Sequence, residues 1–162
     1  MTVRPETQDQ DTDASAKTKR PEATFFKLKA QLLDQGRTNT ILAATDNMEA
    51  RIKVYASGGE NALHTHVNED HMFVIMQGSA RFYGPEGEER EIGPKEGIMI
   101  PAGAYYWFQA TSEEPLVLIR VGARANPGDR QDRRNIKGGP LPGNSKANKQ
   151  VEIIYRDGAY YE

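Results

Sequence analysis

The sequence predicts an all-β protein that folds as a small antiparallel β-barrel or jelly roll. Between residues 48 and 122, short runs of alternating apolar and polar residues recur, each bounded by glycine, proline, asparagine or charged pairs. Such alternation is typical of strands that bury one face. No helical pattern alternates with these runs, so a parallel sheet with crossover helices is not expected. Several short strands separated by turns favour a sandwich or barrel.

The N-terminal region is predicted to contain a disordered tail and a short helix. Residues 1–21 carry almost no large apolar side chain, so they cannot offset the entropy lost on ordering. They also lack the apolar stretch of a signal peptide. The following stretch, FFKLKAQLLDQG, places Leu28, Leu32 and Leu33 at helical spacing, and Gly36 is a plausible helix stop.

The barrel domain is predicted to cover residues 22–122. In RIKVYA, Ile52 and Val54 fall on one face of a strand. GPEGEER, after Tyr83, has the composition of a hairpin loop. The other predicted strands are HMFVIMQG, ARFYG, GIMIP, YYWFQA and PLVLIRVG.

The C-terminal part is predicted to be an irregular segment followed by one strand. Residues 123–150 are rich in glycine, proline and asparagine, and residues 122–150 hold seven Lys or Arg against two Asp. We interpret this segment as a solvated basic linker. In residues 151–162, Val151, Ile153 and Tyr155 alternate as in a strand, which could pair with a sheet edge of its own or of a partner subunit.

Composition narrows the range of partners and compartments. The chain has no cysteine, so it has neither disulfides nor a thiolate metal site, and a cytoplasmic protein is expected. Its net charge of −2 predicts no binding to nucleic acid or to a membrane surface. No window approaches the roughly 18 apolar residues that a membrane span needs.

All three histidines lie in the stretch HTHVNEDH. His64 and His66 are two residues apart in a predicted strand, so their side chains leave the same face. The turn-like VNED lets the chain reverse, and His71 then opens the next strand on the face of Phe73 and Ile75. Three imidazoles that converge in a barrel mouth can bind a metal ion. The alternative is that they are polar surface residues of a loop.

This stretch resembles the first motif of the cupin family. That motif has Gly, five residues, His-x-His, three or four residues, Glu, six residues and Gly. Here Gly58 is followed by five residues, then by His64 and His66, four residues, His71, six residues and Gly78. The resemblance implies a small antiparallel barrel, commonly a homodimer, with a metal ion inside.

The second cupin motif is also similar, with one departure. It has Pro-x-Gly, two residues and His, and here PAGAYY offers Pro101, Gly103 and then Tyr106 at the position of His. The first motif departs as well, because His71 stands at the position of Glu. The resemblance covers about residues 48–122.

Carried over residue by residue, the resemblance implies a site for one divalent metal ion per chain. His64 and His66 keep their ligand positions, and His71 and Tyr106 stand at the other two. Tyr106 either ligates the metal ion or acts beside it as a hydrogen-bonding and proton-transferring catalytic residue. We expect iron, with zinc, nickel, manganese and copper as alternatives.

The predicted pocket is largely apolar around this metal. By alternation, Phe108 and Met99 are the inward neighbours of Tyr106, and Phe73 and Ile75 lie across the barrel. A ligand set of three histidines leaves the 2+ charge of the metal uncompensated, which favours a small anionic substrate.

Three functions fit these features. The first is an iron-dependent dioxygenase that acts on a small enolisable or phenolic substrate. The second is a redox-neutral lyase or isomerase of a small acid or sugar, in which Tyr106 moves a proton. The third is a cupin module that binds a small ligand without turnover. One fold hosts many chemistries, so the resemblance does not choose among them.

Overall fold

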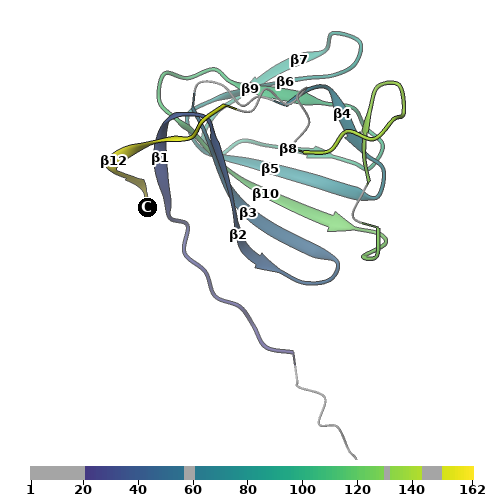
Figure 1. Cartoon of the computed structure of the whole chain (residues 1–162), viewed down its shortest axis with the longest axis horizontal. Coiled ribbons are helices and arrows are strands. Elements are labelled where there is room, and N and C mark those ends of the chain that lie inside the picture. Colours follow the sequence, from purple (N-terminus) through teal and green to yellow (C-terminus); the bar gives the residue numbers. More distant parts are fainter. Residues whose placement is uncertain (1–20, 57–60, 130–131, 144–150) are drawn as a thin grey trace, which may run out of the picture.

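The computed structural model describes residues 21–56, 61–129, 132–143 and 151–162. These parts of the chain form an all-β structure in which every paired strand is antiparallel, and they contain no helix. The predicted all-β fold class is therefore confirmed (Figure 1). Within the described ranges, no helix could cross a membrane.

Most strands follow one another with short connections, as the alternating runs of the sequence predict, and the longest connection links β11 to β12. Their bounds are β1 Ala30–Gln35, β2 Arg37–Ala44, β3 Met48–Tyr55, β4 His64–His66, β5 Glu69–Gln77, β6 Ala80–Tyr83, β7 Glu89–Ile92, β8 Gly97–Ile100, β9 Trp107–Ala110, β10 Leu116–Arg124, β11 Arg133–Asn135 and β12 Ile154–Tyr161.

Two larger sheets form the walls of the barrel. One has the strand order β2-β3-β10-β5-β8 and the other β7-β6-β9, while β4 pairs with β11 and β1 with β12. The inner faces of the two larger sheets meet in one apolar cluster. Both sheets contribute to it, with Tyr55, Phe73, Ile75, Leu116 and Leu118 from one and Phe82, Ile92 and Phe108 from the other.

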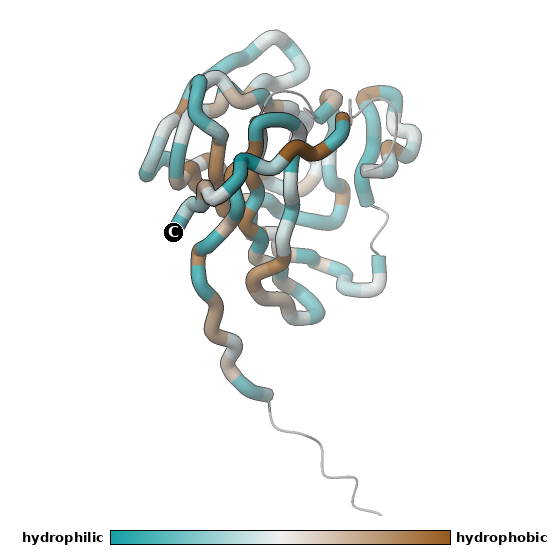
Figure 2. Tube along the Cα trace, turned by 60° about the vertical axis from the view of Figure 1, so that its left-hand side comes forward, coloured by the Kyte–Doolittle hydropathy of each residue, from teal (hydrophilic) through white to brown (hydrophobic). Residues whose placement is uncertain are grey.

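A second, smaller cluster lies on the outer face of the five-stranded sheet. Ile52 and Val54 of β3 and Val117 of β10 pack there against Leu33 of β1. Consecutive residues of β3 thus point alternately into the barrel and toward the β1–β12 pair, which explains the period-two pattern of the sequence. Apolar and hydrophilic positions are accordingly interspersed along the strands in Figure 2.

The interior of the barrel changes from apolar to charged along β3 and β10. On β3 the inward positions run from the buried Tyr55 through Lys53 and Arg51 to Glu49. On β10, Leu116 and Leu118 belong to the apolar cluster, and Arg120 follows at the next inward position. One end of the barrel is therefore filled with side chains, and the other end holds a polar pocket.

The helix predicted within residues 25–36 is wrong. Residues 21–29 extend away from the barrel without regular structure, and Ala30–Gln35 form strand β1. β1 pairs with β12, a strand more than 100 residues away, and Leu33 is completely buried against β3 and β10. The spacing of the leucines suits a helix, but tertiary pairing with β12 overrides that local preference. Gly36, the predicted helix stop, instead links β1 to β2 with a φ of 86°.

The C-terminal region contributes more regular structure than the sequence indicates. The predicted strand of residues 151–162 corresponds to β12, which pairs with β1 of the same chain. Within the basic segment 123–150, β10 continues to Arg124, and β11 pairs with the strand that carries His64 and His66. The predicted disordered tail comprises residues 1–21. Residues 1–20 of this range lie outside the described residues.

Candidate functional site

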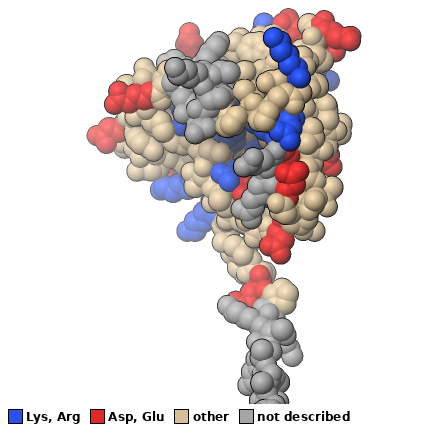
Figure 3. Space-filling model, turned by 45° about the vertical axis from the view of Figure 1, so that its right-hand side comes forward, with Lys and Arg blue, Asp and Glu red and all other residues tan. Residues whose placement is uncertain are grey.

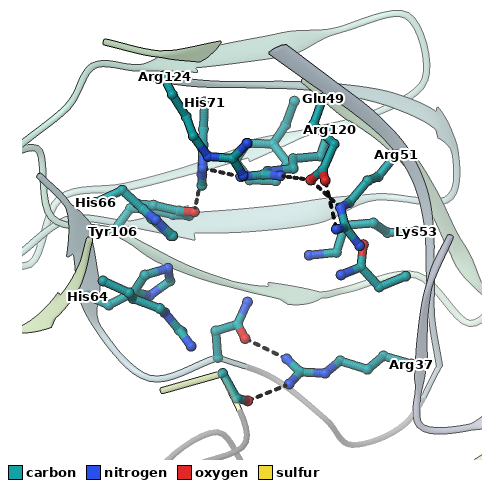
Figure 4. A pocket seen from close by; sticks show the side chains of 15 residues that line it. Arg37, Glu49, Arg51, Lys53, His64, His66, His71, Tyr106, Arg120 and Arg124 are labelled. Carbon is teal, nitrogen blue, oxygen red and sulfur yellow. Dashed lines mark hydrogen bonds and ion pairs between the residues drawn. The ribbon is translucent and has the colours of Figure 1, made fainter. Parts of the chain in front are cut away.

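A pocket of about 470 Å³ opens at the polar end of the barrel. Its lining includes the three histidines, Tyr106 and Phe73, together with charged side chains from β2, β3, β10 and β11. In Figure 4 the histidines and Tyr106 lie on one side of the pocket, and Arg37, Arg51 and Lys53 lie on the other. Lys and Arg side chains are also visible in the hollow of the face shown in Figure 3.

Short strands hold the predicted ligand residues in place. β4 carries His64 and His66, and β11 pairs with it on one side. On the other side the backbone groups of His64 and Tyr106 exchange two hydrogen bonds of 3.1 and 2.9 Å. The rings therefore lie close together: centroids are 4.5 Å apart for His64 and Tyr106, and 4.1 Å apart for His66 and His71. The structure thus brings all four sequence-predicted ligand residues to one pocket.

Hydrogen bonds fix the tautomer of each imidazole. Nδ1 of His64 donates to the carbonyl of Ala62 at 2.7 Å, and Nδ1 of His66 donates to the carboxylate of Asp132 at 3.0 Å. Nε2 of His71 accepts from the guanidinium of Arg120, so its Nδ1 carries the proton and faces the Tyr106 hydroxyl at 2.9 Å. With these partners at the other nitrogen, the neutral form of each ring has its lone pair on Nε2, and this is the form that binds metal ions.

The carboxylate of Glu69 lies close to two of these rings, those of His66 and His71. His66, Glu69 and His71 each offer a ligand atom, and the three atoms lie within 4.8 Å of one another. Among the described residues, this is the group of His and carboxylate side chains that could hold a metal ion. Two His and one carboxylate give the site a negative charge, whereas the three-histidine set expected from the sequence has none.

Burial sets the protonation state of the rings. Desolvation lowers the pKa of His64 to about 2, and it also lowers the pKa of His71 to about 4 against the opposing effect of the Glu69 carboxylate, which lies 3.5 Å from the ring. Both rings are therefore neutral at pH 7. Burial alone would raise the pKa of Glu69, but the adjacent His71 ring and the charges of Arg120 and Arg124 lower it to about 2. Glu69 is thus an ionised carboxylate.

Arg120 connects the site to a second buried carboxylate. Its Nη2 donates to Glu69 at 2.6 Å and also contacts His71, and its Nη1 donates to Glu49 at 3.0 Å. Glu49 in turn accepts from Arg51, and Arg124 lies 3.6 Å from Glu69. These buried charges are paired with one another, as buried charges must be if the folded state is to tolerate them.

Tyr106 is buried and keeps its proton. Desolvation raises the pKa of its hydroxyl well above the ordinary value of a tyrosine. Its oxygen accepts from Nδ1 of His71, so its own O–H stays available to donate. A neutral phenol is a poor metal ligand, and this arrangement suits a hydrogen-bond donor beside the site better than a ligand.

The other sequence-predicted pocket residues are dispersed. Phe73 lines the pocket. Ile75 and Phe108 are buried deeper in the apolar cluster and are absent from the lining. Met99 is 63% exposed, because β8 is an edge strand and Met99 lies on its outer face. The lining is charged rather than apolar, since the inward positions of β3 and β10 near the open end hold ionic side chains.

Sequence reasoning missed several residues that shape the site. Glu69 reads as a turn residue, yet it begins β5 and is 4% exposed. Arg120 lies in an otherwise apolar run, PLVLIRVG. A single charged residue in such a run indicates a buried charge that is paired with a buried carboxylate. Asp132 lies in the segment interpreted as a linker, yet it orients His66. No local pattern reveals that contact, because 66 residues separate the two.

Comparisons with known proteins show that part of this chain is similar to one family. Residues 51–122 match the family model described as "Cupin domain". An uncharacterised protein with a double-stranded β-helix domain from Klebsiella pneumoniae superimposes with a TM-score of 0.51 at 17% identity, over 57% of this chain and 81% of its own. A cupin superfamily protein from Desulfitobacterium hafniense superimposes with a TM-score of 0.52 at 16% identity. The match covers 59% of this chain and 84% of that protein. Comparison with curated proteins gives no match.

A third structure extends the likeness beyond bacteria. The Cnp3 cupin domain of Schizosaccharomyces pombe superimposes with a TM-score of 0.51 at 18% identity, over 57% of this chain and 67% of its own. At such identities the likeness concerns the fold alone. The chemistry of this chain therefore has to be argued from its own pocket.

Proposed function

Residues 51–122 of this chain match the cupin domain family, and from that premise we propose that the chain is an iron-dependent dioxygenase of a small anionic substrate that is enolisable or phenolic. The observation that carries the proposal is the group of His66, Glu69 and His71, two of which, His66 and His71, line a pocket rich in cationic side chains. Two His and one carboxylate with open positions are the ligand set typical of non-haem iron(II) oxygenases.

The residues present fit a metal ion. The tautomers leave lone pairs on Nε2, and Asp132 supports His66 in the way that carboxylates commonly support metal-bound histidines. Nη2 of Arg120 contacts both Glu69 and His71, so a metal ion shared by these two residues would replace that contact. Nη1 of Arg120 would keep its hydrogen bond to Glu49.

The side chains around this group suit an anionic substrate. When bound, iron(II) would supply the site at which substrate and dioxygen meet, and a dioxygenation places both oxygen atoms in the product without an external reductant. Arg51 and Arg124 line the pocket and attract an anion. The O–H of Tyr106 can donate to a substrate oxygen on which negative charge develops.

One observation favours the second candidate, a redox-neutral lyase or isomerase. Tyr106 and His71 form a buried pair at 2.9 Å, through which a proton could pass to or from a bound acid. This reaction needs the same anion-binding walls but consumes no dioxygen. A module that binds its ligand without turnover would need neither the pair nor a metal ion.

Metal analysis and oxygen uptake separate these functions. We expect the untagged protein to hold one iron ion per chain and to consume dioxygen with one of a panel of small keto acids and catechols. His66→Ala should lose the metal and remain folded. Thr65→Ala, a change in the same strand, should keep it. Bound zinc or nickel with no uptake, together with conversion of a small acid, would favour the lyase or isomerase. Full metal occupancy in His66→Ala would contradict the site.

Gly122 offers a second way to test the metal group. It lies opposite His71 in the β10–β5 pairing, and a Cβ at this position would collide with the carboxylate of Glu69 and come within 2.8 Å of Arg120 Nη2. These atoms are ends of flexible side chains, so Gly122→Ala should fold. The displaced carboxylate should lower metal affinity about 10- to 100-fold, measured by competition with a chelator.

Gly128→Ala serves as the matched control for this substitution. A Cβ at residue 128 would approach only Asn126, at 3.5 Å, which is ordinary contact. We expect its metal affinity to equal that of the unaltered protein. Equal affinity in Gly122→Ala as well would show that Glu69 takes no part in metal binding.

A further inference from the structure

The pocket contains more positive than negative side chains. Arg37, Lys53 and Arg133 line it in addition to the arginines that pair with Glu49 and Glu69. Among the described residues that line the pocket, Glu49 is the single carboxylate, and it already pairs with Arg51 and Arg120. Of these cations, Arg37 and Lys53 lie on the side of the pocket opposite the histidines (Figure 4).

Arg37 and Lys53 face this part of the pocket from neighbouring strands, β2 and β3 (Figure 4). The guanidinium of Arg37 donates to Asn61 and to the carbonyl of Gly143, both uncharged acceptors. Nζ of Lys53 lies 5.3 Å from the centre of the Tyr55 ring. Within the described ranges, neither cation forms an ion pair with a carboxylate.

We propose that Arg37 and Lys53 bind a second anionic group of the substrate, so that the ligand is a small dianion such as a dicarboxylate or a phosphorylated acid. This inference deepens the proposed function and rests on it for the position of the first anionic group, at the metal. The second group lies on the opposite side of the pocket. The two walls together select against acids that carry a single charge.

The cost of leaving Lys53 without a counter-ion supports this arrangement. Lys53 is partly buried, and desolvation lowers its pKa below the ordinary lysine value. A cation held in this state gains more from an anionic ligand than an exposed lysine does, because the ligand replaces lost hydration. Arg37 adds a planar donor that can hold two oxygens of a carboxylate or phosphate at once.

The first experiment uses the full chain without metal, so that it does not depend on the metal site. After treatment with chelator and dialysis, inorganic phosphate is titrated at constant ionic strength and binding is followed by calorimetry. We expect Lys53→Met and Arg37→Gln each to weaken phosphate binding about tenfold or more. Arg90→Gln, which removes an exposed cation of β7, should leave it unchanged.

The second experiment uses the metal-loaded chain and compares succinate, phosphonoacetate and acetate. Both dianions should bind about tenfold or more tightly than acetate, and Lys53→Met should abolish the difference. The preference between succinate and phosphonoacetate then identifies the second group as a carboxylate or a phosphate. Thermal unfolding of Lys53→Met confirms that it folds, and removal of a partly buried charge should not lower its melting temperature.

Two results would overturn the inference. One is phosphate affinity that is unchanged in both Lys53→Met and Arg37→Gln. The other is equal affinity for acetate and succinate in the metal-loaded chain. A chain that binds phosphate through Arg37 and Lys53 but holds no metal would refute the proposed function alone, so the two failures are distinguishable.

Discussion

Replacement of Glu69 by glutamine is expected to destabilise the protein by about 3 kcal/mol and to lower its metal affinity by about two orders of magnitude. Glu69 is 4% exposed and lies 2.6 Å from Arg120 and 3.6 Å from Arg124. Glutamine keeps the size of the side chain but removes its charge, so two arginines lose a counter-ion inside the barrel. Arg120 still pairs with Glu49, which keeps the cost at the lower end of the usual range.

Urea unfolding of the chelator-treated protein measures the change in the free energy of unfolding. Competition with a chelator measures the change in metal affinity. Glu91→Gln is the control, since Glu91 pairs with Arg81 on the exposed face of the three-stranded sheet. Exposed ion pairs contribute little to stability, so this variant should unfold at nearly the same urea concentration as the parent. Equal behaviour of Glu69→Gln and Glu91→Gln would mean that the Glu69–Arg120 contact is not formed in solution.

Acid is expected to destabilise the metal-free protein well before carboxylates in general are protonated. The pKa of His64 is lowered to about 2 and that of His71 to about 4, chiefly by burial. In the unfolded chain both rings titrate near pH 6.5. Between pH 6.5 and 4 the unfolded state therefore binds more protons than the folded state, and stability falls as the pH is lowered. The two rings together account for a loss on the order of 5 kcal/mol between pH 7 and pH 4.

Glu69 continues this trend at lower pH. Its pKa of about 2 lies below the ordinary value, so its contribution is present above about pH 4.5 and is lost as the pH falls toward 2. Urea unfolding at constant ionic strength from pH 4 to pH 8 measures the slope. Near pH 5 the slope of the unfolding free energy against pH should correspond to an uptake of about two protons on unfolding. In His64→Gln the slope should correspond to an uptake of about one proton. A stability that is independent of pH between 6.5 and 4 would show that the rings are not buried.

The sequence by itself determined the strands of the barrel and the place where the histidines meet. Alternation in β3, β5 and β10 follows from strand geometry, which sends neighbouring side chains to opposite faces, so a local pattern is enough to predict it. The spacing of His64, His66 and His71 around a turn likewise predicts convergence from local geometry. These predictions needed no knowledge of distant contacts, and the structure contains the strands and the cluster.

Only the tertiary structure decided which charges enter the pocket and how the ends of the chain fold. Asp132 reaches His66 because β11 pairs with β4, and Ala30–Gln35 form a strand because β12 pairs with them. Glu69 becomes a buried partner of His71 because Arg120, 51 residues away, neutralises it. Each of these outcomes depends on a contact between segments far apart in the chain, and local periodicity carries no information about such contacts.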